Sequence, residues 1–188
     1  MHDDYVLFQG TPIENLGRKF FYEAINVEEE PVAVDYWNRK YDTDIGRHHW
    51  QLIHSIRESR LRALAWKVIH NIYPTNTTLH KMKISQTPLC INCNVLDTLE
   101  HFFFQCDQVG PLWREIQQKI LVDFKTKINL SEKIVLLGPV GIQGINLDTQ
   151  KKIKHILTVG LLTISKFKYG KRRNIKDVFH FEARLRNL

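Results

Sequence analysis

The stretch CINCNVLDTLEHFFFQC runs from Cys90 to Cys106 and contains all three cysteines of the 188-residue chain. Its cysteines and its histidine follow the spacing C-x2-C-x7-H-x4-C. A structural zinc ion takes four ligands in a tetrahedron, mostly thiolates and imidazoles that occur in close pairs along the chain. Cys90 and Cys93 form the first pair, and His101 and Cys106 form the second. The spacing therefore predicts one structural Zn²⁺ in a closed site of the CCHC zinc-knuckle kind.

An alternative is that the stretch holds three reduced cysteines and a surface histidine, because free cysteine is common in protein cores. Against this interpretation, no cysteine lies outside the pattern. Zinc suits a thiolate-rich closed site better than an iron–sulfur cluster, which normally takes four cysteines. The aromatic run Phe102–Phe104 is expected to pack around the site, with a base-stacking platform as the alternative.

The charge of the chain is unevenly distributed. The net charge is +7, but residues 1–150 carry 16 Lys and Arg against 18 Asp and Glu, whereas residues 151–188 carry 11 against 2. A nearly neutral body with a strongly basic end is typical of proteins that bind a polyanion. Nucleic acid is the first candidate and an anionic membrane surface the second, and we expect nucleic acid, RNA or DNA, and no membrane.

Five cations gather within eight positions near this basic end, and the sequence predicts that they bind phosphates: Lys166, Lys168, Lys171, Arg172 and Arg173. Phe167 and Tyr169 lie between them and could stack on unpaired bases. The alternatives are a solvated helix end with its aromatic rings in the core, or a nuclear-import signal. Arg57, Arg60 and Lys67 also occur near an apolar helix face, where ordinary solvent exposure explains them equally well.

Hydrophobic spacing predicts a mainly helical fold. One apolar stripe with helical periodicity consists of Leu61, Leu64, Ala65, Val68, Ile69 and Ile72. Pro74 ends that helix, and Thr75 is expected to cap a shorter one that runs to about Met82.

Further helices are expected over 111–121, over a periodic apolar stretch from Ile153 to Ile164 with a break at Gly170, and over the amphipathic residues 175–188. We therefore predict a small helical domain with a Cys-Cys-His-Cys zinc-binding loop and a basic helical C-terminal tail. The predicted division is an N-terminal connecting segment at 1–44, the zinc-binding domain at 45–120, a connecting helix and Gly/Pro linker at 121–150, and the tail at 151–188.

The motifs resemble a known family. The segments LAWKVIHNIYPTNTTLHKM, CINC, EHFFFQC and LW are similar to the zinc-binding domain at the C-terminal end of reverse transcriptases of non-LTR (long interspersed) retrotransposons. The matching positions are Trp50, Trp66, His70-Asn71, Pro74-Thr75, Cys90, Cys93, His101, Cys106 and Leu112-Trp113. The resemblance covers roughly residues 45–118, and it implies a zinc-stabilised region that helps to hold template RNA or target DNA near a polymerase.

Catalysis is not expected. A polymerase needs an aspartate pair on a hairpin and a third carboxylate far upstream, and the only adjacent pair here, Asp3-Asp4, follows just two residues. Glu28–Glu30 would point in different directions on a helix, so we interpret them as a solvated acidic run. His48, His49 and His54 lack a paired partner at metal-ligand spacing. The sequence thus predicts no catalytic residues and no small-molecule substrate.

The function expected from the sequence is a non-catalytic, zinc-stabilised module that binds the RNA or DNA backbone without sequence-specific readout. Two alternatives stay open: a zinc-stabilised protein-interaction domain with an unknown partner, and a non-functional truncated retroelement relic. The chain begins without the pattern of a secretory signal, and no apolar run approaches the roughly 20 residues needed to cross a bilayer. We therefore expect an intracellular location, in the nucleus, the cytoplasm or both.

Overall fold

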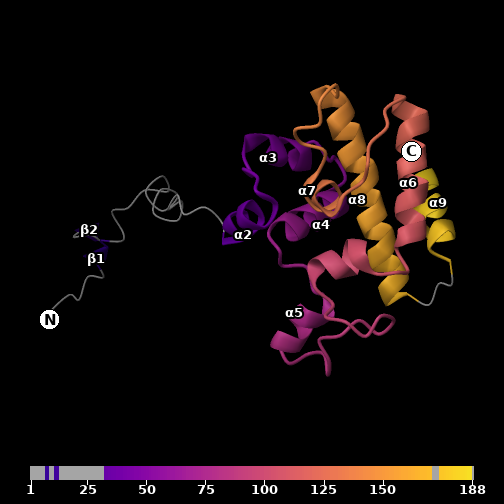
Figure 1. Cartoon of the computed structure of the whole chain (residues 1–188). Coiled ribbons are helices and arrows are strands. Elements are labelled where there is room, and N and C mark those ends of the chain that lie inside the picture. Colours follow the sequence, from indigo (N-terminus) through magenta and orange to yellow (C-terminus); the bar gives the residue numbers. More distant parts are fainter. Residues whose placement is uncertain (1–6, 9–10, 13–31, 171–173, 188) are drawn as a thin grey trace, which may run out of the picture. The chain divides into compact units, whose positions relative to one another are not determined.

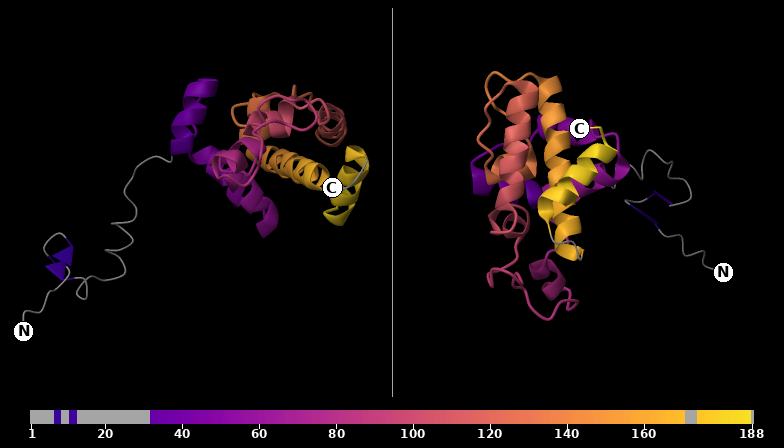
Figure 2. Two further views of the ribbon diagram at one scale, coloured as in Figure 1. Left: turned by 90° about the horizontal axis from the view of Figure 1, so that it is seen from below. Right: turned by 90° about the vertical axis from the view of Figure 1, so that its right-hand side faces the viewer.

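The computed structural model describes residues 7–8, 11–12, 32–170 and 174–187, and the chain divides into two units, residues 1–31 and 32–188. In the first unit, β1 (Leu7–Phe8) pairs antiparallel with β2 (Thr11–Pro12). The second unit is helical and is shown in Figures 1 and 2. Its elements are α2 (Val32–Tyr41), α3 (Arg47–His54), α4 (Ser59–Ile69), α5 (Asn76–Lys81), η2 (His101–Gln105), α6 (Gly110–Phe124), α7 (Glu132–Leu137), α8 (Leu147–Tyr169) and α9 (Ile175–Leu185). The mainly helical fold predicted from the sequence is confirmed.

Helix α8 lies at the centre of the second unit. It contacts α3, α4, α6 and α9, and Figure 2 shows α6 and α9 beside it. Every residue from 156 to 164 is buried, so that all faces of the helix are covered over this length. Residues 151–188 therefore supply the central helix and one side of the unit as well as its basic charge.

Gly160 allows α6 to approach α8 closely. A Cβ atom at this position would lie 2.5 Å from Cδ1 of Ile116 and 2.9 Å from Cζ3 of Trp113. The indole N–H of Trp113 donates to the backbone carbonyl of Phe103 at 2.7 Å, which fixes the ring. The packing of α6 against α8 therefore depends on the missing side chain at residue 160.

The predicted end of the first apolar stripe is wrong. Helix α4 ends at Ile69, and Asn71 adopts a left-handed conformation with φ 52°. Because the chain leaves helical geometry there, Ile72 does not continue the buried face and is 50% exposed. The stop thus comes before Pro74, although the other members of the stripe are buried as predicted.

Other predicted helix features are confirmed. The hydroxyl of Thr75 accepts a hydrogen bond from the backbone N–H of Thr78 and caps α5. Helix α6 covers the predicted range 111–121, α8 ends at Tyr169 before Gly170, and α9 covers most of the amphipathic C-terminal segment.

The glycine- and proline-bearing stretch 137–149 joins α7 to α8, and Gly138, Gly141 and Gly144 all have positive φ. The four-segment division of the chain stays a prediction, while the boundary between compact units lies after residue 31.

Among the described residues, no helix combines the length and the apolar character needed to cross a membrane.

Lys154 gives the stability of the fold a testable pH dependence. Its side chain is completely buried, and its ammonium group donates to the backbone carbonyl of Leu136 at 3.1 Å. Burial lowers the pKa of Lys154 to about 7, whereas an unfolded lysine has a pKa of about 10.4. Between these values the unfolded chain binds a proton that the folded chain does not, so this residue makes the free energy of unfolding rise with pH.

We therefore expect the free energy of unfolding of the wild type, minus that of Lys154→Met, to increase between pH 7 and pH 10. The increase is at most about 1.4 kcal/mol per pH unit. Urea unfolding of both proteins, followed by circular dichroism at several pH values, measures this difference, and groups shared by the two proteins cancel. A difference that stays constant over this range would contradict the assignment.

Candidate metal centre

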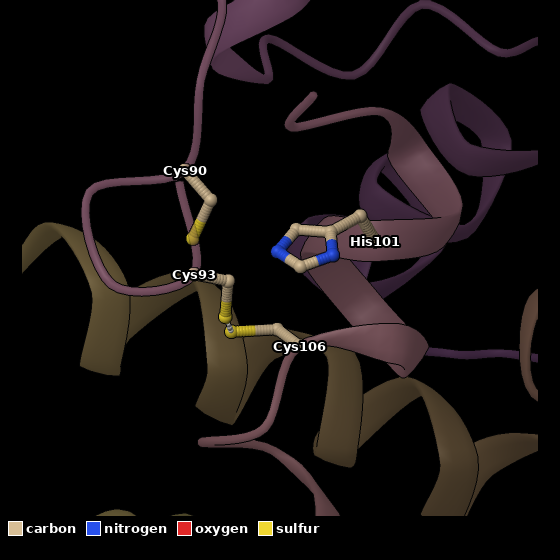
Figure 3. A group of neighbouring side chains, drawn as sticks. All are labelled: Cys90, Cys93, His101 and Cys106. Atoms are coloured by element: carbon tan, nitrogen blue, oxygen red, sulfur yellow. Dashed lines mark hydrogen bonds between the residues drawn. The ribbon is translucent and has the colours of Figure 1, made fainter. Parts of the chain in front are cut away.

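The first pair of cysteines lies on a tight loop. An isolated antiparallel bridge joins Leu89 to Leu96 and closes this loop at its base. At its tip, the backbone N–H of Asn94 donates to the carbonyl of Cys90 at 2.9 Å, and Asn94 has a left-handed φ of 54°. This turn brings the side chains of Cys90 and Cys93 to the same side of the loop (Figure 3).

The second pair lies on the π-helical turn η2 and directly after it. The backbone N–H of Cys106 donates to the carbonyl of His101 at 3.0 Å, five residues earlier. This wide turn places an imidazole and a thiol against the cysteine loop. The predicted second pair, His101 and Cys106, is therefore held by a single wide turn.

The four predicted ligand residues come together. One ligand atom from each of Cys90, Cys93, His101 and Cys106 lies within 4.8 Å of the others. The Sγ atoms of Cys93 and Cys106 are 3.6 Å apart, and tetrahedral zinc with bonds of about 2.3 Å would hold two sulfurs about 3.8 Å apart. Figure 3 shows the imidazole directed toward the sulfurs. No other such group gathers among the described residues, and His48, His49 and His54 do not form one.

An unsatisfied nitrogen supports metal binding at this cluster. Nε2 of His101 is buried and has no hydrogen-bond partner among the described residues. Buried polar atoms in proteins are almost always paired, and a metal ion would supply the missing partner. Burial, assisted by the charge of Lys168, lowers the pKa of His101, so the neutral imidazole keeps a lone pair available at neutral pH.

The thiols lie in unequal surroundings. Burial raises the pKa of Cys106 to about 11. Burial acts in the same direction on Cys90, but the backbone N–H groups of Asn92 and Cys93 and the charge of Lys168 outweigh it, so that the pKa of Cys90 is lowered. Thiolates are the form that binds metal, so an ion in this cluster would displace the protons of the thiols.

Lys168 supplies positive charge beside the cluster from a distant part of the chain. Its Nζ atom lies 3.7 Å from Oδ1 of Asp97 and 4.3 Å from the centre of the Phe102 ring, and its side chain is only 8% exposed. The other carboxylate oxygen of Asp97 accepts from the backbone N–H of Asn76 at 3.2 Å. A divalent ion with three thiolates would carry a net negative charge, and Lys168, although it pairs with Asp97, would be a source of compensating positive charge beside it.

The aromatic run packs in the core, as expected. Phe102 and Phe103 are buried, with ring centres 4.8 Å apart, and Tyr73 packs edge-on against Phe103 at 4.8 Å. These two phenylalanines therefore support the ligand-bearing turn η2 and offer no surface to an unpaired base.

The predicted phosphate ligands are only partly described. Lys166 forms an ion pair with Glu182 of α9, and Lys168 lies beside Asp97. Lys171, Arg172 and Arg173 lie outside the described residues. Phosphate binding by these five residues stays a prediction.

The sequence pattern did not identify Lys168 and Asp97 as neighbours of the metal cluster; it predicted Lys168 only as a phosphate ligand. The signal for Lys168 was available, because it continues the buried spacing of Leu157, Leu161 and Ile164 by one further turn of the helix. Nothing in the local sequence indicated that Asp97 would face it.

Comparison with known proteins identifies this region. Residues 26–113 match the model of a family described as zinc-binding in reverse transcriptase. Residues 26–113 are a reverse transcriptase zinc-binding domain. No match was found among curated proteins. The predicted resemblance to a reverse transcriptase zinc-binding domain is confirmed, while the non-LTR origin stays a prediction. The matched span contains all four clustered residues but ends before α8.

Replacing a ligand of the zinc-binding domain should remove its metal. We expect His101→Ala to purify with much less bound metal than the wild type, measured by inductively coupled plasma mass spectrometry. Hydrogen exchange should also become faster over residues 88–106. His54→Ala, at an exposed histidine of α3, is the matched control and should keep a full metal complement. Full metal occupancy in His101→Ala would rule out the proposed ligand set.

Lys168 should strengthen metal binding by the domain. We expect Lys168→Met to weaken metal affinity on the order of tenfold, as is typical for residues that support metal ligands. Competition with a chelator, followed by the thiolate absorption of bound Co²⁺, measures this affinity. Lys166→Met is the control, because Lys166 belongs to the same helix but pairs with Glu182. Equal affinities for the two variants would show that Lys168 is not involved.

Proposed function

We propose that this chain is a non-catalytic nucleic-acid-binding module whose fold is held by one structural Zn²⁺ at Cys90, Cys93, His101 and Cys106. The observation that carries the proposal is the closed set of three thiols and one imidazole within a reverse transcriptase zinc-binding domain. Three thiolates favour zinc over harder divalent ions. Four protein ligands also leave no open position for a reacting water, which supports a structural role.

The charge of the chain supports a polyanionic partner. Residues 151–188 hold 11 basic residues against 2 acidic ones, and the whole chain has a net charge of +7. Lysine and arginine side chains bind phosphates and release counterions, which gives affinity without reading the base sequence. We therefore propose RNA or DNA backbone as the ligand, encountered in the nucleus or the cytoplasm.

The origin we propose is the C-terminal region of a non-LTR retrotransposon reverse transcriptase. The sequence features that support this origin are the tryptophan-bearing helix that leads to His70-Asn71, the pair Pro74-Thr75, and Leu112-Trp113 after the last cysteine. These features surround the metal cluster in the order that the resemblance implies.

A second candidate function is protein interaction, and one observation favours it. Several large apolar side chains on and before the cysteine loop are exposed: Met82 at 63%, Ile84 at 67%, Ile91 at 93% and Leu96 at 55%. A partner protein that covers them would bury apolar surface. A translated relic of a retroelement is distinguished from both functions by a lack of binding to any partner.

Binding to nucleic acid is tested by fluorescence anisotropy of the zinc-loaded full chain with labelled single-stranded RNA and DNA. We expect a micromolar or lower Kd that weakens on the order of tenfold or more between about 50 and 200 mM salt. The absence of binding even at low salt would refute the proposal.

The position of the phosphate contacts is tested with a charge-reversal pair. Arg172→Glu combined with Arg173→Glu should weaken binding and flatten its salt dependence, because fewer counterions are released. Lys125→Glu combined with Lys127→Glu makes the same charge change at exposed positions after α6 and is the control. An equal loss of affinity in both double variants would mean that binding depends on the net charge of the protein and not on the position of the arginines.

A further inference from the structure

Three aromatic rings form a partly exposed row on α3 and at the end of α4. The ring centres of Trp66 and His70 are 4.2 Å apart, and those of Trp50 and His70 are 5.4 Å apart. Trp66 ends the row and is 46% exposed, while Trp50 and His70 are half-buried. The chain thus holds a large apolar ring at its surface, supported from behind by two others.

The other two tryptophans show what a structural tryptophan looks like in this fold. Trp37 is 0% exposed and donates its indole N–H to the carbonyl of Ile69 at 2.7 Å. Trp113 is 5% exposed and donates to the carbonyl of Phe103. Trp66 has neither burial nor, among the described residues, an indole hydrogen bond. Its exposed ring therefore contributes little to the core and is free to contact a ligand.

Cations flank the exposed ring. At 100° per residue, Trp66 and His70 lie in the middle of the outward face of α4, with Arg62 on one side and Lys67 and Arg60 on the other. Helix α4 contains no acidic residue. Both carboxylate oxygens of the adjacent Glu58 accept hydrogen bonds from the guanidinium group of Arg186, at 2.7 and 2.8 Å. Within the described part of the chain, none of the three α4 cations forms an ion pair.

The row of rings itself is uncharged at neutral pH, because burial lowers the pKa of His70. An uncharged aromatic surface between positive side chains is complementary to single-stranded nucleic acid, whose bases stack on rings while its phosphates bind cations. A duplex fits less well, because its base faces are already covered by neighbouring bases.

We infer that the outward face of α4 is a stacking site for single-stranded nucleic acid, in which Trp66 receives an unpaired base and Arg62 and Lys67 bind the phosphates beside it. The inference rests on the proposed function and places base contact on a helix distinct from the basic C-terminal cluster. It makes affinity depend on the presence of bases as well as on charge.

The test compares two labelled oligonucleotides of equal length and charge, oligouridylate and the matching abasic strand. We expect the wild-type full chain to bind oligouridylate roughly five- to tenfold more tightly than the abasic strand. Trp66→Leu should bring the two affinities together, because leucine keeps the apolar helix surface but removes the ring. Trp66→Phe keeps a ring and should retain most of the preference. Circular dichroism and metal content establish that both variants are folded.

Tryptophan fluorescence provides a second measurement that needs no variant to be folded. Oligouridylate should quench the emission of the exposed Trp66 in the wild type, and the abasic strand should not, because it has no base to stack on the ring. Trp37 and Trp113 are buried and should not respond to either strand. Equal wild-type affinity for the two strands, or an unchanged preference in Trp66→Leu, would overturn the stacking site and leave the proposed function intact. Failure of the wild type to bind either strand would overturn both, and would favour a protein partner on this surface.

Discussion

The packing of helix α8 is the constraint on which the rest of the helical unit depends. Residues 156–164 are buried on every side, and Gly160 gives α6 its close approach through Ile116 and Trp113. Such a helix cannot be held by one apolar stripe, and it needs neighbours on all faces. Helices α3, α4, α6 and α9 provide them. This central position also buries the amino group of Lys154, which loses its hydration and keeps one hydrogen bond, to the carbonyl of Leu136.

The last two turns of α8 contact the region around the metal cluster. Besides Lys168, the hydroxyl of Ser165 lies 2.5 Å from that of Tyr73, and the hydroxyl of Tyr169 donates to the carbonyl of Pro74. These contacts join α8 to the segment between α4 and α5. Asp97 accepts a hydrogen bond from the backbone N–H of Asn76, the first residue of α5. The matched family span ends at residue 113, yet part of the support for its metal cluster comes from beyond it. We therefore regard the cluster and the helical body as one cooperative structure.

The basic residues serve more than one purpose. Lys154 is buried and donates to a backbone carbonyl, the ammonium group of Lys168 lies beside Asp97, and Lys166 pairs with Glu182, so these three lysines are used inside the protein. Arg60, Arg62 and Lys67 remain on the outward face of α4 beside exposed aromatic rings. A count of charges along the sequence cannot separate these classes, because burial is decided by neighbours that are far away in the chain.

The sequence by itself determined which four residues gather at the candidate metal centre, the cap at Thr75 and most helices, because these depend on local spacing and on hydrogen bonds between near neighbours. It misjudged Ile72, where the left-handed Asn71 ends α4 early. Only the tertiary structure decided that Lys168 faces Asp97 and that Trp50 supports His70 and Trp66. Asp97 and Lys168 are brought together by the packing of α8, and Trp50 and His70 by the packing of α3 on α4. Contacts of this kind follow from how helix surfaces fit one another, which residue spacing within a single helix does not specify.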